Sequence, residues 1–153
     1  WANIRGKFIS IVFQQALSAL NPVITIGNQM KEAISIHQPE INPKEITEKS
    51  KELLAETGLI ETERMLRSYP HELSGGQLQR VVIAMAIAHK PKIIIADEPT
   101  GNLDSKTELE VISMLKSCVS EYGQTLVMIT HDETIAQMAD RMIVIEDGKV
   151  VRA

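Results

Sequence analysis

Aromatic residues and positive charge are both scarce in this sequence. Phe, Trp and Tyr make up only 3% of its residues, and its formal net charge is −4. Proteins that bind nucleic acid need a basic surface, and those that hold single strands also need aromatic side chains on which bases stack. The composition therefore predicts no nucleic-acid partner.

Cysteine and long apolar runs are scarce as well. The single cysteine, Cys118, cannot form an internal disulfide and has no cluster of metal ligands around it, which favours a reducing compartment and a role in helix packing. No run of about 18 apolar residues occurs, so no transmembrane helix is predicted. The sequence starts at Trp1 with neither an initiator Met nor a signal-peptide pattern, and we expect an internal fragment of a longer protein.

The sequence does contain enough apolar material for one folded domain, because 44% of its 153 residues are hydrophobic. In the first half of the chain, periodicity and turn signals predict a strand within 7–13, helices starting near Thr25 and at Pro43, a short helix around Met65, and a helix from Ser74 to about His89. In the second half they predict a strand at 93–96, a helix from Ser105 to about Tyr122, a strand at 125–129 and a helix near 134–139. Two last strands are predicted at 142–145 and 149–151, joined by a turn at Asp147-Gly148. The first half is thus predicted to be mainly helical and the second half to be α/β.

Some of these helices carry their own boundary signals. Asn42 is expected to cap the helix that starts at Pro43, with Glu45 completing a capping box and Gly58 ending the helix. In the helix of the second half, Ser105 is the expected cap and Leu109 is expected to face inward.

The stretch Leu73-Ser74-Gly75-Gly76-Gln77 has the features of a helix start that binds an anion. Ser74 is placed to act as N-cap, and Gln77, three residues on, completes a capping box. Gly75 and Gly76 have no Cβ, so an anion can approach the backbone N–H groups while the positive end of the helix faces it. An ordinary glycine-rich loop before an amphipathic helix is the alternative.

Two carboxylates follow a continuously apolar segment. Ile93–Ala96 is expected to form a strand buried on both faces, and Asp97 and Glu98 come directly after it. Burying adjacent carboxylates without a cation or a proton is costly, so their position at the strand end favours a binding site over core packing. A solvated turn is the alternative. The segment resembles a Walker B motif.

These motifs occur in the order found in the nucleotide-binding domains of ABC transporters, which the sequence resembles over nearly its whole length. Gln14 resembles the Q-loop glutamine, 73–77 the signature, Asp104 the D-loop aspartate and His131 the switch histidine. Singly, each has an ordinary explanation as a loop residue, a helix cap or a structural histidine.

The resemblance implies the α/β three-layer core of a phosphate-loop ATPase with an inserted, mainly helical subdomain. Residues 15–90 correspond to the helical subdomain, and residues 1–14 and 91–153 to the core portion. The family's phosphate loop, Gly-x-x-x-x-Gly-Lys-[Ser/Thr], occurs nowhere in the sequence, so only a partial core is expected. The missing strand belongs between 125–129 and 142–145, and we expect a gap there, or direct pairing of these strands, swapping between chains, or oligomers.

The resemblance also implies ATP and Mg²⁺ as ligands and assigns roles to the motif residues. Asp97 would hold Mg²⁺, with Gln14 linking the metal site to the membrane partner. Glu98 would polarise the attacking water, and His131 would contact the γ-phosphate. The ATP held by a second domain would be covered in trans by the signature, and Asp104 would support that dimer; the signature residues concerned are Ser74, Gly75, Gly76 and Gln77.

The partners implied are a second nucleotide-binding domain, transmembrane permease subunits and, indirectly, a solute-binding protein. The implied location of the subunit is the cytoplasmic face of the membrane.

Without the phosphate loop, this chain alone is expected neither to bind ATP tightly nor to hydrolyse it, because nothing else in it neutralises the phosphates.

The subfamily and the substrate are less well defined. The stretches Phe13-Gln14, Ser18–Pro22 and Tyr69–Glu72 are most similar to peptide and nickel importers, whereas Pro99–Asp104 is closer to lipoprotein-release and antimicrobial-peptide-type ATPases. A non-catalytic interaction fragment is another alternative. A DNA-repair ABC ATPase would need a long coiled coil before the signature, and only short helices fit there.

Overall fold

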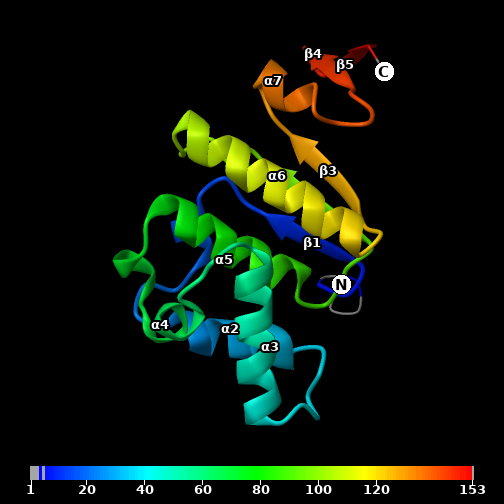
Figure 1. Ribbon diagram of the computed structural model, residues 1–153. Coiled ribbons are helices and arrows are strands. Elements are labelled where there is room, and N and C mark those ends of the chain that lie inside the picture. The colour runs from blue at the N-terminus through cyan, green and yellow to red at the C-terminus, as the bar shows by residue number, and fades with distance from the viewer. Residues whose placement is uncertain (1–3, 5, 153) are drawn as a thin grey trace.

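The computed structural model describes residues 4 and 6–152 (Figure 1). Its elements are, in chain order, β1 (Ile9–Val12), α1 (Ala16–Ala19), α2 (Ile26–Ser35), α3 (Pro43–Glu56), α4 (Thr62–Arg67), a 3-10 turn η1 (Pro70–Glu72), α5 (Gly75–Ile87), β2 (Ile93–Asp97), α6 (Ser105–Glu121), β3 (Thr125–Ile129), α7 (Glu133–Ala136), β4 (Val144–Glu146) and β5 (Lys149–Arg152). The predicted order of elements is confirmed except for α1, which lies where a loop was predicted, and η1, which was not predicted.

Three strands form one parallel sheet, in the order β1, β2, β3. Ile95 in the central strand pairs with Ile11 of β1 and with Val127 of β3. The chain passes from β1 to β2 through helices α1 to α5 and from β2 to β3 through α6. Because the strands are parallel, their carboxyl ends lie along one edge of the sheet.

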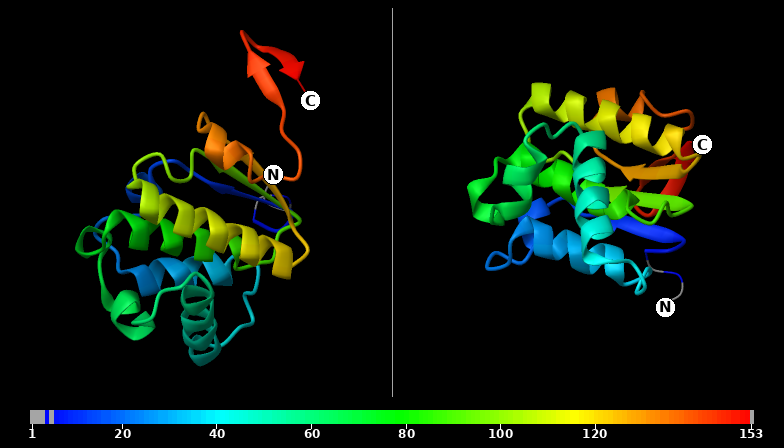
Figure 2. Two further views of the ribbon diagram at one scale, coloured as in Figure 1. Left: turned by 45° about the horizontal axis from the view of Figure 1, so that its top comes forward. Right: turned by 60° about the horizontal axis from the view of Figure 1, so that its bottom comes forward.

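Helices α5 and α6 pack side by side on one face of this sheet (Figures 1 and 2). On that face, Ile94 and Ala96 of β2 are completely buried. On the opposite face Ile11, Val127 and Ile129 are 43%, 46% and 52% exposed. The prediction that the central strand is buried on both faces is therefore wrong, since no helix of the described residues covers the second face. The α/β core is partial, as expected, with two of the three implied layers.

Strands β4 and β5 form a separate antiparallel hairpin, which projects from the rest of the molecule in the left view of Figure 2. Its turn residues Asp147 and Gly148 have φ values of 48° and 74°, the left-handed conformation that a tight two-residue hairpin turn requires. Among the described residues no strand pairs with the outer edge of 125–129, which agrees with the predicted gap. Direct pairing of 125–129 with 142–145 does not occur in the described part of the chain.

The helices of the first half pack against α5 and share one apolar core with the sheet. The largest completely buried side chains of these helices are Ile26, Met30, Ile34, Leu54, Ile83 and Ile87. Asn42 caps α3 by accepting the N–H groups of Lys44 and Glu45, and Gly58, with φ of 79°, follows its end as predicted. Glu45 contributes only its backbone N–H, so the predicted capping box is not completed.

Helix α6 differs from its prediction in two respects. Asp104 is its N-cap, and Ser105 is its first residue. Leu109 is 45% exposed, because at about 100° per residue it lies roughly 120° around the helix from the buried Leu115. Cys118 is buried, which confirms its predicted packing role. Within the described residues, none of the helices combines the length and the apolar composition needed to cross a bilayer.

Candidate functional site

The carboxyl-terminal edge of the sheet collects four of the predicted site residues. Gln14 lies two residues beyond β1, Asp97 ends β2 with Glu98 directly after it, and His131 lies two residues beyond β3. The parallel register sets these strand ends next to one another. Residues as far apart in the chain as Gln14 and His131 therefore share one edge.

Glu98 and His131 are in direct contact at this edge. Oε1 of Glu98 accepts the backbone N–H of His131 at 2.9 Å and lies 2.6 Å from its Nδ1. Glu98 has a φ of 45°, in the left-handed region that residues with a side chain rarely adopt. Its own N–H donates to the carbonyl oxygen of Ile129 in β3 at 2.9 Å. This unusual backbone, held by the neighbouring strand, keeps the carboxylate beside His131.

The carboxylate changes the ionisation of the histidine. The hydrogen bond that His131 donates to the Glu98 carboxylate, and then the negative charge of that carboxylate, raise the pKa of His131 above the ordinary value of 6.5. With Nδ1 directed to the carboxylate, Nε2 is the ring nitrogen left for another ligand, and the side chain is 82% exposed. In the protonated form both ring nitrogens are donors, so Nε2 can donate to an anion. His131 also lines a cavity of about 430 Å³ together with Met142, Ile145 and Arg152.

Gln14 lies over the loop that follows Glu98. A Cβ placed on Gly101 would be 2.9 Å from Nε2 of Gln14, and the N–H of Gly101 donates to the carbonyl oxygen of Glu98 at 3.1 Å. The glutamine therefore contacts the loop between the Walker B-like strand and α6.

The residues at this edge could hold Mg²⁺ only if phosphate oxygens complete its coordination shell. Asp97, which is exposed, and Gln14 offer oxygen atoms, the ligands that Mg²⁺ prefers. Among the described residues, no group of three or more His, Cys, Asp or Glu side chains is arranged to hold a metal. Protein-bound Mg²⁺ commonly takes one or two carboxylates and completes its shell with water and phosphate oxygens. Asp97 with Gln14 can therefore supply part of such a shell.

The signature stretch forms the helix start that the sequence predicts. Oγ of Ser74 accepts the N–H of Gln77 at 3.3 Å, and Oε1 of Gln77 accepts the N–H of Ser74 at 3.0 Å. This complete capping box opens α5 at Gly75, and the predicted cap is confirmed. Ser74 and Gly75 are exposed and Gly76 is half-buried, so part of this helix mouth is open.

Asp104 is engaged within its own helix. Its Oδ1 accepts the N–H of Thr107 at 3.1 Å, and its Oδ2 accepts the hydroxyl of Thr107 at 2.7 Å. These two bonds, the hydroxyl first, lower the pKa of Asp104. The structure thus assigns this aspartate the ordinary role of a helix cap.

A cavity of about 340 Å³ joins the start of α5 to the loops around Gln14. Its lining includes Gln14, Gly75, Gln79 and Leu103, and does not include Asp97, Glu98 or His131. The structure therefore brings Glu98 to His131, and it brings Gln14 and Gly75 of the signature to one cavity that Asp97 and Glu98 do not line.

Two residues of this region, Gln79 and Thr107, were not predicted from the sequence. Gln79 is 2% exposed, lines the cavity and has no hydrogen-bond partner for its Nε2. Its signal was a polar residue on the inward face of an apolar helix. Thr107 holds both oxygens of Asp104, and its signal was the Asp-x-x-Thr spacing of a helix N-terminus.

A parallel sheet with carboxylates and a histidine at its carboxyl edge, beside a capped glycine-rich helix start, is an arrangement typical of α/β proteins that bind nucleotides. Residues 1–101 match the model of the family described as ABC transporter, and the chain belongs to that family. The resemblance predicted from the motifs is confirmed.

Curated relatives match the chain from end to end. It is 44% identical over 153 residues to the oligopeptide transport ATP-binding protein OppD of Mycobacterium tuberculosis and 40% identical over 152 residues to the oligopeptide transport ATP-binding protein AppD of Bacillus subtilis. It is also 38% identical over 149 residues to the glutathione import ATP-binding protein GsiA of Salmonella typhi. The matches cover 99%, 99% and 97% of this chain, but only 25%, 46% and 24% of those proteins. The chain therefore spans less than half the length of these relatives.

Solved structures of ATP-binding cassettes share the fold. One, a dimer in a post-hydrolysis state bound to ADP and Pi, superposes with a TM-score of 0.82 at 38% identity, over 96% of this chain and 62% of that chain. Another, a dimeric bacterial ABC transporter cassette, gives 0.84 at 39% identity, over 98% of this chain and 63% of that chain. The predicted fold class, a partial ATPase core with a helical insertion, is confirmed.

Proposed function

We propose that this chain is the part of an ABC transporter ATP-binding subunit that aligns the attacking water and contributes the signature surface, in a protein that hydrolyses ATP to drive peptide import. The observation that carries the proposal is the contact of Glu98 with His131 at the carboxyl edge of the parallel sheet. Family membership and the transport roles in the names of OppD, AppD and GsiA support it.

The chain's own residues act on water and on the outer phosphate. Glu98 accepts a hydrogen bond from the attacking water and orients it, which is positioning catalysis. His131, whose pKa Glu98 raises, donates in its protonated form from Nε2 to an oxygen of the γ-phosphate. Mg²⁺, held in part by Asp97 and Gln14, would neutralise charge on the phosphates when bound.

The signature works on a different nucleotide from the one at the sheet edge. Ser74, Gly75, Gly76 and Gln77 cover ATP seated on a second nucleotide-binding domain, and Asp104 supports the contact between the two domains. The dimeric cassettes that share this fold support such an arrangement, as does the separation of the signature cavity from Asp97 and Glu98.

The remaining assignments extend the proposal to the whole protein. Permease subunits and, through them, a solute-binding protein are its partners, and the subunit lies at the cytoplasmic face of the membrane. Residues 15–90 act as the helical subdomain, and 1–14 with 91–153 belong to the core. The nickel alternative stays a prediction.

The experiment that tests the proposal is a phosphate-release assay on the full-length gene product, with Asp97→Asn as the variant, joined to uptake of labelled oligopeptides by cells that carry or lack the gene. Steady hydrolysis that Asp97→Asn abolishes, with gene-dependent peptide uptake, is expected. Hydrolysis without peptide uptake would mean that the protein serves the transport of another substrate, such as those of the lipoprotein or antimicrobial-peptide systems. No hydrolysis would favour the non-catalytic interaction fragment.

This chain on its own is expected to show neither tight ATP binding nor turnover, because it lacks the loop that neutralises the phosphates. Calorimetric titration with Mg-ATP, alongside phosphate release, measures both quantities. Micromolar binding or steady turnover by the isolated chain would contradict the assigned role of the missing loop.

A further inference from the structure

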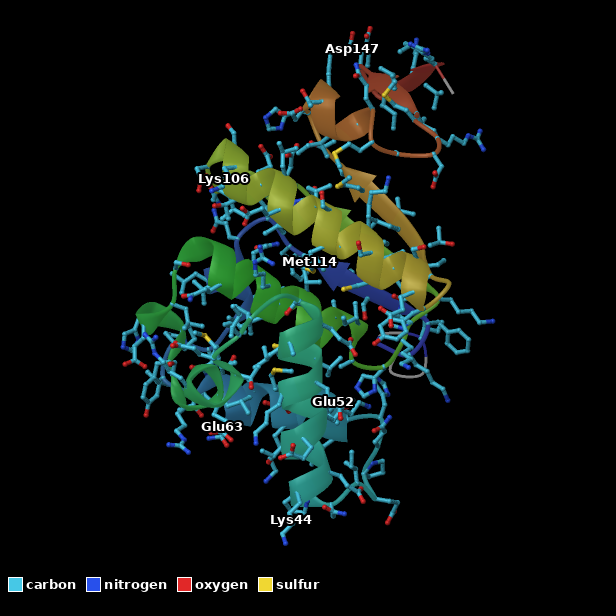
Figure 3. All side chains as sticks on the ribbon, in the orientation of Figure 1. Lys44, Glu52, Glu63, Lys106, Met114 and Asp147 are labelled. Carbon is cyan, nitrogen blue, oxygen red and sulfur yellow. The ribbon has the colours of Figure 1, made fainter. Side chains whose placement is uncertain are left out.

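The starts of α5 and α6 approach each other closely at Gly76 and Thr107. Figure 1 shows the two helices side by side with their N-terminal ends on the same side of the molecule, and Figure 3 labels Lys106 on the first turn of α6. A Cβ placed on Gly76 would lie 2.7 Å from Cγ2 of Thr107. Real Cβ atoms essentially never approach a neighbour this closely, so a side chain at position 76 must displace the threonine methyl.

The neighbouring glycine is different. A Cβ placed on Gly75 would meet only Cδ2 of Leu103, at 3.4 Å, which is close to ordinary van der Waals contact. The two glycines of the signature are therefore under unequal constraint, and Gly76 alone is required by contact with α6.

The other side of Thr107 holds Asp104. Its hydroxyl donates to Oδ2 and its backbone N–H donates to Oδ1 of that aspartate. A single threonine thus touches two segments: its methyl packs on the first turn of α5, and its hydroxyl fixes the end of the loop 101–104.

We propose that Thr107 is a positioning residue that holds the signature, 74–77, and the loop 101–104 as one unit, and that position 76 is glycine because of this contact. The inference rests on the proposed function and deepens it: the surface offered to a second nucleotide-binding domain is built from two helix starts whose relative position Thr107 sets. Approach of an anion to the backbone does not by itself require glycine at position 76, because a Cβ there would point to Thr107.

The methyl and hydroxyl groups of Thr107 can be removed separately. Thr107→Ser deletes the methyl that opposes Gly76 and keeps the hydroxyl that holds Asp104. Thr107→Val keeps a methyl and deletes the hydroxyl. Gly76→Ala adds the single atom that collides, and loss of activity would not come from helix propensity, since Ala is the better helix former.

The experiment is a double-mutant cycle in the full-length gene product, with kcat for ATP hydrolysis, KM for ATP and the urea midpoint of unfolding as readouts. Gly76→Ala is expected to lower kcat ~10-fold or more, and Gly76→Ala/Thr107→Ser to restore most of that loss, the size of coupling usual for residues in contact. Gly76→Ala/Thr107→Val should not recover. The matched control is Gly75→Ala, whose effect on kcat should be the same with Ser or Thr at position 107.

The outcomes separate this inference from the proposed function. If Gly76→Ala keeps wild-type kcat, or is impaired equally with Ser and Thr at position 107, the inference is overturned. If adding Thr107→Ser to Gly76→Ala restores the urea midpoint but not kcat, Thr107 contributes only to packing, and its positioning role is overturned. If the wild-type protein hydrolyses no ATP, the proposed function fails, and the contact is judged by the midpoints alone: recovery with Thr107→Ser supports it, and no recovery overturns it.

Discussion

Glu98 combines an unfavourable backbone conformation with a contact to His131, and both features act at the scale of single residues. Replacing Glu98 with Gln keeps the side-chain volume and removes the charge. In the full-length gene product we expect turnover to fall at least ~100-fold, the usual range for loss of a group that handles a reacting proton. ATP binding should persist, because this carboxylate adds only negative charge near the phosphates. Phosphate release and calorimetry measure the two effects.

The matched control for Glu98 is Glu110→Gln. Glu110 is an exposed carboxylate on α6 that pairs with Arg80 at 3.4 Å, a surface contact of small energetic value. Turnover of the control variant should stay near that of the wild type. Equal turnover by the Glu98→Gln variant would remove Glu98 from the mechanism.

The ionisation of His131 gives a second test at this scale. Its pKa is raised in the folded protein, so its contact with Glu98 stabilises the fold fully below pH 6.5 and loses that effect as the pH rises through the folded pKa. Titration of the imidazole proton signals by NMR should give a pKa above 6.5 in the wild type. The pKa should fall toward 6.5 in Glu98→Gln. An unchanged titration in that variant would contradict the contact.

At the scale of single elements, capping decides where helices begin. Asn42 accepts two backbone N–H groups at the start of α3, which lies far from the site, near Lys44 in Figure 3. Asn42→Ala should lower the free energy of unfolding by about 1 kcal/mol, and the control Asn42→Asp, which keeps an acceptor, should lower it much less. Urea unfolding followed by circular dichroism measures both variants. Equal midpoints for Ala and Asp would show that the cap contributes nothing.

At the scale of the whole molecule, the main feature is the bare face of the sheet, meaning the face of β1, β2 and β3 that no helix of the described residues covers. Ile11, Val127 and Ile129 are about half exposed there, and a parallel sheet is normally covered on both faces. Because β3 is an edge strand of the three-stranded sheet, we expect the isolated chain to self-associate.

Light scattering coupled to size-exclusion chromatography tests this expectation. Val127→Thr/Ile129→Thr should shift the isolated chain toward monomer, because it makes the bare face more polar while keeping β-branched side chains. Ile60→Thr is the control, since Ile60 is 95% exposed between α3 and α4 and lies outside this face. A monodisperse monomer of the wild-type chain would refute the prediction.

The sequence by itself determined the helix and strand order apart from α1 and η1, the start of α5 at the Ser74–Gln77 box, and the family. These depend on local interactions: a cap bonds a backbone group two or three residues away, and apolar periodicity repeats within a few turns. Where two neighbouring residues could both cap a helix, local signals were not sufficient: Ser105 was the predicted N-cap of α6, but Asp104 is the N-cap.

Only the tertiary structure decided which residues meet across long stretches of chain. Glu98 reaches His131 because β2 and β3 pair in one particular register, and Gly76 meets Thr107 because α5 and α6 share one face of the sheet. The uncovered second face is likewise invisible in the continuously apolar Ile93–Ala96, since a strand's own sequence does not say whether a helix covers it. These contacts depend on side chains brought together by packing, and no local pattern encodes them.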